Sequence, residues 1–130
     1  MKASVGSSVN FTWSFTGNVG RINWGLKQAG ANLIDFGNIL VTIAKDGTSS
    51  SSLAPAAYSG RVSGSRSGDS SSGQVIFTLS QMTLNDGNLD YGCKIEALNN
   101  PFDLGDFDYL HLDVEGECIS VLFITIQWLH

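Results

Sequence analysis

The segment Arg61-Val62-Ser63-Gly64-Ser65-Arg66-Ser67-Gly68 is followed downstream by Phe77-Thr78-Leu79-Ser80-Gln81-Met82 and then by Asp86…Tyr91-Gly92-Cys93. Apolar and polar side chains alternate in the middle stretch, which is the period of a strand with one buried and one wet face. Upstream, Trp24 follows Trp13 by eleven residues. These features, in this order, indicate strands joined by turns.

The same alternation extends over most of the chain. The 130 residues, of which 42% are apolar, allow one domain with a real core. No sustained helical period occurs, and turn-forming residues separate the apolar runs. We expect Lys45 to Gly60, rich in Ser and Ala, to be a loop or a poorly paired edge. Strands are predicted around Val9–Phe15, Ile22–Leu26, Val75–Leu79, Tyr91–Ile95 and Leu110–Val114. Between the second and third of these lie two short apolar runs, Leu33-Ile34 and Ile39 to Ile43, separated by Asp35-Phe36-Gly37-Asn38.

Together the motifs resemble the variable-type (V-set) domains of the immunoglobulin superfamily, over roughly Val5 to Glu115. The three quoted segments are similar to the D strand, the E strand and the F-strand signature D-x-G-x-Y-x-C of that family. The resemblance implies an all-β fold, a V-type immunoglobulin-like two-sheet Greek-key sandwich spanning residues 1–115. It also implies that Trp24 is the core tryptophan, Tyr91 the tyrosine-corner residue and Cys93 the F-strand cysteine.

Three positions depart from the family pattern. Trp13 stands where the B-strand cysteine belongs, so the usual inter-sheet disulfide cannot form. We expect Trp13, Trp24, Tyr91 and Cys93 to form one buried cluster, with an acceptor for the Trp13 indole N–H. The carboxylate that pairs with the D-strand arginine is displaced by one residue, and we expect Arg61 to contact Asp86 nevertheless. The joining-segment pattern F-G-x-G is replaced by Gly105-Asp106-Phe107-Asp108.

The second cysteine, Cys118, lies beyond the end of the last predicted strand. A hairpin turn near Phe102 would place Cys93 opposite a residue close to His111, which leaves Cys118 about 20 Å further along. That distance is outside disulfide reach. We therefore expect no disulfide within the chain, an inert buried thiol at Cys93, and a Cys118 that is either free or bonded between chains.

Charge and motifs exclude several functional classes. The net charge is −5 without a Lys/Arg cluster, which argues against nucleic acid and anionic membranes as partners. His111 and the terminal His130 belong to no metal-binding spacing, and no nucleophile has a base nearby in sequence, so we expect neither an enzyme nor a cofactor. Asp103, Asp106 and Asp108, predicted to lie in one loop, form either a solvated acidic turn or a calcium site.

The family is overwhelmingly extracellular, which implies a secreted or cell-surface location. The sequon Asn10-Phe11-Thr12, with its asparagine on the outward face, agrees with secretion. Because Met1-Lys2-Ala3-Ser4 leads directly into a strand pattern, we expect any signal peptide to have been removed from this sequence.

The family usually binds its partners through the sheet of strands G, F, C and C′ or through the loops at its end. On that sheet Gly25 and Gly92 replace the usual interface aromatics, and we expect them to leave a shallow groove of bare backbone or merely to ease strand twist. The candidate partner-binding residues are Asn23, Gly25, Lys27, Phe36, Gly92, Lys94, Glu96, Phe102, Tyr109 and His111.

Three functions follow as hypotheses. The first is a recognition or adhesion module of an immune-type or self-recognition receptor, with a protein partner, a second copy of the chain included. The others are a secreted lectin-like domain that binds a glycan or small ligand through its loops, and a structural spacer. Charged and aromatic residues that converge on the sheet would favour the recognition module. A deep pocket at the loop end would favour the lectin-like domain, and an evenly polar sheet would favour the spacer.

The C-terminal segment 116–130 stands apart from the predicted domain. Its apolar part, Ile119 to Leu129, has eleven residues against the ~20 that a membrane-spanning helix needs, so we expect no membrane insertion. The segment is interpreted either as the start of a stalk or membrane anchor or as a non-native extension. In both cases we expect an extended strand that takes part in a homodimer.

Overall fold

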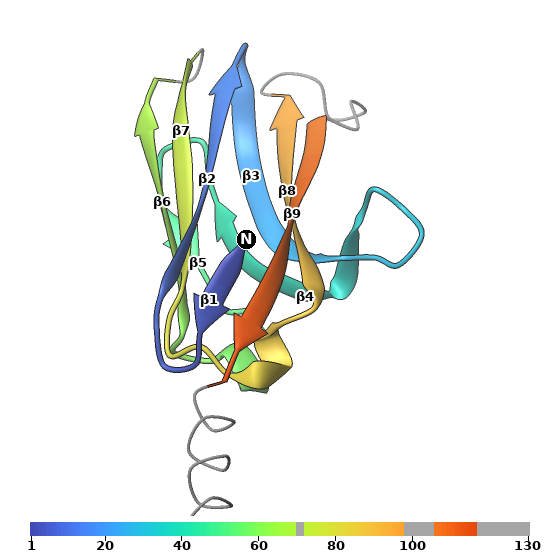
Figure 1. Cartoon of the computed structure of the whole chain (residues 1–130). Coiled ribbons are helices and arrows are strands. Elements are labelled where there is room, and N and C mark those ends of the chain that lie inside the picture. Colours follow the sequence, from blue (N-terminus) through green and yellow to red (C-terminus); the bar gives the residue numbers. More distant parts are fainter. Residues whose placement is uncertain (70–71, 98–105, 117–130) are drawn as a thin grey trace, which may run out of the picture.

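Two β-sheets face each other and make up the fold (Figure 1). The computed structural model describes residues 1–69, 72–97 and 106–116. The larger sheet has six strands in the order β1 (Lys2–Ser4), β9 (Asp106–Glu115), β8 (Leu89–Ala97), β3 (Val19–Lys27), β4 (Ile34–Ile43) and β5 (Ser49–Ser50). The smaller sheet has three, β2 (Val9–Thr16), β7 (Ser72–Leu79) and β6 (Val62–Gly68). The predicted all-β, two-sheet architecture is confirmed.

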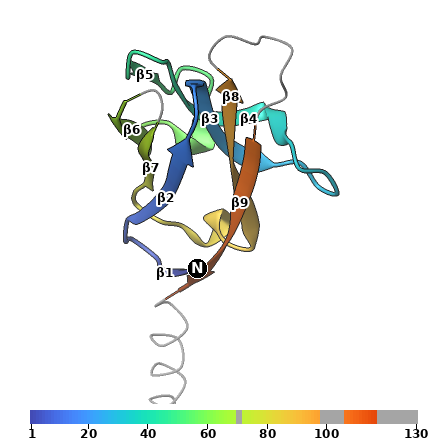
Figure 2. The same cartoon turned by 90° about the horizontal axis from the view of Figure 1, so that it is seen from above.

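Neighbouring strands pair antiparallel, with the exception of β1, which runs parallel to β9. Seen from above, β1 lies beside β9 at one edge of the larger sheet (Figure 2). Between β4 and β6 only the two-residue strand β5 and a short 3-10 turn, η1 (Ala56–Tyr58), occur. The segment from Lys45 to Gly60 is thus mostly unpaired, as its composition predicts.

Aromatic rings fill the space between the sheets. Trp24 stacks on Phe77 with ring centroids 5.1 Å apart, and Phe11 lies 5.3 Å from Trp24 and 5.1 Å from Tyr91. These four side chains are fully buried, and each contributes roughly 1.5–3 kcal/mol through removal of apolar area from water. The inward alternation of apolar residues therefore places the core where the sequence predicts it.

Trp13, at the position that the resemblance assigns to a cysteine, is buried in the same core as Trp24, Tyr91 and Cys93. Its indole Nε1 donates a hydrogen bond of 2.9 Å to Asp108 Oδ2, a residue on β9. The link joins the two sheets at the level of Cys93, which pairs with Asp108 across β8 and β9. Cys118 lies outside the described residues, so the predicted absence of an internal disulfide stays a prediction.

The register of β8 and β9 corrects two expectations. Cys93 faces Asp108 and not a residue near His111, because the connection between the strands is centred before residue 102. The prediction that Asp106 and Asp108 belong to a loop is also wrong, since both are part of β9. Asp103 and the C-terminal segment 117–130 lie outside the described residues.

Candidate functional site

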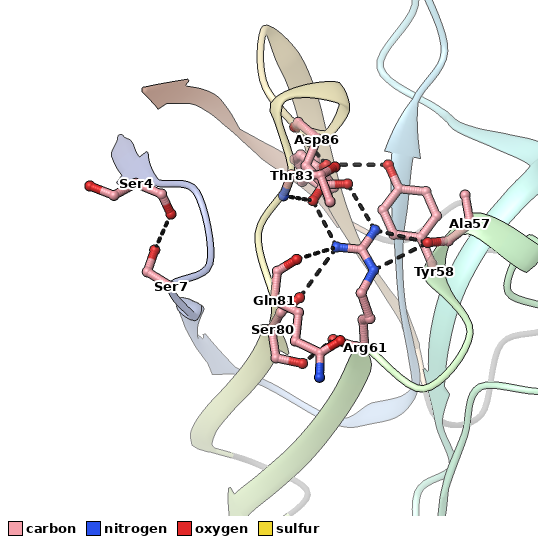
Figure 3. A network of polar contacts seen from close by, with 10 residues as sticks. Ser4, Ser7, Ala57, Tyr58, Arg61, Ser80, Gln81, Thr83 and Asp86 are labelled. Carbon is pink, nitrogen blue, oxygen red and sulfur yellow. Dashed lines mark hydrogen bonds and ion pairs between the residues drawn. The ribbon is translucent and has the colours of Figure 1, made fainter. Parts of the chain in front are cut away.

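A dense network of polar contacts surrounds the guanidinium of Arg61 (Figure 3). It forms a bidentate ion pair with Asp86, with Nη1–Oδ2 at 2.8 Å and Nη2–Oδ1 at 3.0 Å. Its remaining N–H groups donate to the main-chain carbonyls of Ala57, Ser80 and Gln81. The pair thus forms despite the one-residue displacement of the aspartate in the sequence.

Asp86 sits in the 3-10 turn η2 (Leu84–Asp86), which brings its carboxylate to Arg61. Burial opposes ionisation of Asp86, but the hydrogen bonds from Arg61 and from the Thr83 N–H prevail and hold its pKa below the ordinary value. The Tyr91 hydroxyl donates to the Asp86 carbonyl at 2.8 Å. Since the donors of Arg61 are already used within the fold, this cluster stabilises the sandwich and offers nothing to a ligand.

A cleft of about 230 Å³ opens between the ends of β2 and β9 and reaches Trp13, Cys93 and Asp108. Burial, with a smaller effect of the Asp108 charge, raises the pKa of the Cys93 thiol to about 12. A thiol with that pKa is almost wholly protonated at neutral pH and therefore a poor nucleophile. The prediction of a buried, inert Cys93 agrees with this geometry.

The outer face, defined as the side of the six-stranded sheet turned away from β2, β7 and β6, carries most of the predicted partner-binding residues. Asn23 pairs with Lys94, and Lys94 in turn lies opposite Phe107. Tyr109 is 44% exposed, and the Lys27 ammonium lies 4.9 Å from the centre of its ring. The register thus brings side chains from β3, β8 and β9 together on one surface.

The prediction of a groove of bare backbone at Gly25 and Gly92 is wrong, because other residues of the same chain occupy the space above both glycines. The two glycines pair across β3 and β8, and both are buried. A Cβ at Gly92 would lie 2.5 Å from the Phe107 ring, and one at Gly25 would lie 2.6 Å from Ile34 and 2.5 Å from the Asn38 carbonyl oxygen. The glycines are thus required for the chain's own packing.

A second hollow on the outer face does remain open. This recess has a volume of about 400 Å³ and spans β3, β4 and β8 together with the segment after β5. Its lining is mostly apolar on the side of β4, where Ile34 and Ile39 are half-buried and Leu33 and Leu53 are exposed. The complete lining is Arg21, Asn23, Leu33, Ile34, Ile39, Thr42, Leu53, Lys94 and Glu96.

A continuous chain of hydrogen bonds crosses the polar part of the recess. Thr42 Oγ1 donates to Asn23 Oδ1 at 2.9 Å, and Asn23 Nδ2 donates to Glu96 Oε1 at 3.3 Å. Arg21 Nε and Nη2 complete the chain with bonds of 3.0 and 3.3 Å to the two oxygens of Glu96. These four residues join three strands, so the polar wall is fixed by its own contacts.

At the other end of the outer face His111 lies between two carboxylates. Its Nδ1 is 2.7 Å from Asp90 and its Nε2 is 3.1 Å from Asp113. The hydrogen bond with Asp90, followed by that with Asp113, raises the pKa of His111 above its ordinary value. The outward position predicted for this histidine agrees with its exposure.

The predicted partner-binding residues fall into four groups. Asn23, Lys94 and Glu96 line the recess, while Lys27, Tyr109 and His111 lie elsewhere on the outer face. Gly25 and Gly92 are buried beneath that face. Phe36 belongs to β4, but its side chain, like the whole of Phe102, lies outside the described residues.

Sequence reasoning missed part of the recess. Arg21 could have been found, because it precedes Asn23 by two residues and so shares its face of β3. Thr42 pairs directly with Asn23, but this follows only from the register of β3 and β4. Leu53 gave no signal, since it lies in the segment without a strand period.

Among the residues that the structure describes, no helix has the length and apolar character needed to cross a membrane. Within the same ranges, no three His, Cys, Asp or Glu side chains lie close enough to hold a metal ion. The sequence matches no protein-family model, and no curated protein matches it.

Proposed function

We propose that the chain is a V-set immunoglobulin-type recognition domain that binds a protein partner through the outer face of its six-stranded sheet. The observation that carries the proposal is the recess on this face, a partly apolar hollow with convergent polar groups, on the same face as the exposed Tyr109. Binding surfaces commonly combine a partly apolar hollow with aromatic anchors and a polar rim.

The order of the strands supports the family part of the proposal. In variable-type domains two further strands are added to the sheet of strands G, F and C, while strands B, E and D form the other sheet. Here β9, β8 and β3 are followed by β4 and β5, and β2, β7 and β6 form the second sheet. The hydrogen bond from the Tyr91 hydroxyl to the Asp86 carbonyl, five residues upstream, supports the role of tyrosine-corner residue that the resemblance implies for Tyr91.

Binding without catalysis is proposed because the reactive groups on this face are engaged with one another. Glu96 holds Arg21 and Asn23, and His111 lies between Asp90 and Asp113. An evenly polar sheet would favour a spacer, whereas this face combines exposed leucines, a tyrosine and ion pairs. A secreted or cell-surface location belongs to the same proposal and is supported by the exposed Asn10 of the sequon.

An array of extracellular protein domains, with the chain itself among them, tests the proposal. The probe is the tetramerised domain, compared with two variants. Tyr109→Glu places a charge on the outer face, at an exposed position of β9, and Ser63→Glu places the same charge on an exposed position of β6 in the other sheet.

We expect at least one partner to be retained by Ser63→Glu and lost by Tyr109→Glu. A partner that is lost by Ser63→Glu and retained by Tyr109→Glu would show that binding occurs through the other sheet. An array without any partner would favour the spacer.

A further inference from the structure

The apolar half of the recess is suited to a branched aliphatic side chain. Leu33 is 51% and Leu53 67% exposed, so covering either side chain would remove apolar area from water. Ile34 and Ile39 complete this half from β4. The exposed leucines and half-buried isoleucines of this lining form a surface that a single Leu or Ile side chain can cover.

The polar half carries an uncompensated positive charge. Arg21 is neutralised by Glu96, whose two oxygens are both occupied. Lys94, the second cation of the lining, forms no ion pair with any residue in the described ranges. The lining therefore has a net charge of +1 (two cations less one carboxylate), in a chain whose overall charge is −5.

We infer that the recess binds a segment of the protein partner in which a branched aliphatic residue stands next to a carboxylate. The aliphatic side chain covers Leu33, Leu53 and the two isoleucines, and the carboxylate approaches the Lys94 ammonium. This inference rests on the proposed function and specifies the chemistry of the partner.

A segment of a protein fits better than a free small acid. Sites for small molecules bury most of the ligand surface. The recess lies on the face of a sheet, with two of its apolar residues more than half exposed, and so can cover only one side of its occupant. A segment that belongs to a larger surface tolerates this, because the rest of the interface covers its other side.

Capped dipeptides provide the probe. In the intact chain, with isotope-labelled Leu and Ile methyl groups, Ac-Leu-Glu-NH2 is titrated by NMR. We expect shifts of Leu33, Leu53, Ile34 and Ile39 methyls with a dissociation constant of roughly tens of millimolar, since one partly buried leucine supplies most of the affinity.

Three comparisons separate the two parts of the ligand. Ac-Leu-Gln-NH2 should bind about threefold to fivefold more weakly, the size expected of one exposed ion pair. Ac-Ser-Glu-NH2 should bind roughly tenfold more weakly because the aliphatic side chain is missing. The free acid 4-methylpentanoate should bind no more tightly than Ac-Leu-Glu-NH2.

Lys94→Met keeps the aliphatic stem of the lysine and should abolish the preference for Glu over Gln. Lys45→Met, which removes an exposed ammonium outside the recess, is the matched control and should preserve it. High salt applied to the unmodified chain should abolish the same preference, which gives a second test that requires no variant.

Equal binding of the Glu and Gln dipeptides, or shifts confined to other methyl groups, would overturn the inference. So would a free acid that binds tenfold more tightly than the dipeptide, since it would identify a small-molecule site. The array result is independent. A partner lost by Tyr109→Glu without dipeptide binding leaves the proposed function standing and this inference wrong. If the dipeptide binds at the recess but every partner on the array binds Tyr109→Glu as well as the unmodified chain, this inference stands and the proposed function is wrong.

Discussion

Replacement of Arg61 by methionine should destabilise the chain far more than the loss of an ordinary ion pair. Its side chain is 11% exposed and that of Asp86 only 3%, so the substitution leaves a buried carboxylate without its counter-ion. Removing one partner of a buried pair typically costs about 3–5 kcal/mol of unfolding free energy. The hydrogen bond from the Thr83 N–H remains and places the expected value near the lower end, about 3 kcal/mol.

The matched control is Arg21→Met, the same substitution in the pair of Arg21 with Glu96. There the side chains are 58% and 27% exposed, and such pairs contribute about 0–1 kcal/mol. Urea unfolding of both variants at about pH 7 gives the comparison. A difference between them below roughly 0.5 kcal/mol would refute the reasoning, because it would mean that burial does not determine what the Arg61 pair contributes.

The pH dependence gives the same test a second readout. The folded-state pKa of Asp86 is depressed, so its stabilising contribution is present above the unfolded pKa of about 3.9 and is lost as pH falls through the folded value. Without Arg61, fewer contacts oppose the effect of burial, so the pKa of Asp86 rises. As the pH falls, Asp86 is therefore protonated at a higher pH in the variant than in the unmodified chain, and protonation removes the cost of its unpaired charge. We expect the deficit of Arg61→Met to be at least about 1 kcal/mol smaller at about pH 3.5 than at pH 7. A deficit independent of pH would contradict the assignment to an unpaired carboxylate.

Three further predictions concern the core and the outer face. Trp13→Phe and Asp108→Ala should each lower the unfolding free energy by about 1.5–3 kcal/mol, the value of a hydrogen bond to a charged group. A double-mutant cycle in urea should show a coupling of about 1 kcal/mol or more between the two positions. Additive effects would mean that the bond is not formed. Gly92→Ala should cost about 1–3 kcal/mol through contact with the Phe107 ring, and Phe107→Leu in the same chain should recover part of the loss; a neutral Gly92→Ala would show that the ring yields freely. The folded-state pKa of His111 is raised, so NMR titration should place this pKa above about 6.5. The stabilising contribution of the His111 contacts should therefore be present below about pH 6.5 and be lost as pH rises through the folded-state pKa. A midpoint below about 6.5 would contradict the contacts with the two carboxylates.

Some features follow from the sequence because they depend on local spacing. Strand alternation alone places Phe11, Trp13 and Phe77 inward, since the side-chain period of a strand is two. The contact of Arg61 with Asp86 follows from the family pattern, because a short 3-10 turn absorbs the one-residue displacement.

Other features depend on which strand lies beside which. Alternation places Gly25 and Gly92 on the outer face, but it cannot show that Ile34 and Phe107 cover them. That depends on the bulged register of β3 with β4 and on the length of the connection from β8 to β9. The acceptor for Trp13 could have been found by extending the inward alternation of Leu110 and its neighbours to Asp108, but the length of the acidic loop was overestimated.

Polar contacts between the two sheets also affect how the outer face is held. In this chain β9 is attached to the second sheet by the bond from Trp13 to Asp108, and β3 by Arg66, which donates to the carbonyls of Val19 and Gly20. These contacts are polar and individually modest, on the order of 1–3 kcal/mol each.

The recess does not depend on them, because its polar wall is joined across β4, β3 and β8 within one sheet. A site whose side chains are already fixed loses less conformational entropy when a partner binds. The two groups of contacts therefore make separable predictions. Asp108→Ala should lower the unfolding free energy while leaving dipeptide binding at the recess unchanged. Thr42→Val, which breaks the chain of hydrogen bonds at Asn23, should weaken binding with little change in stability, since Thr42 is only half-buried. If both variants changed stability and binding together, the recess would depend on the packing of the whole sandwich and not on its own sheet.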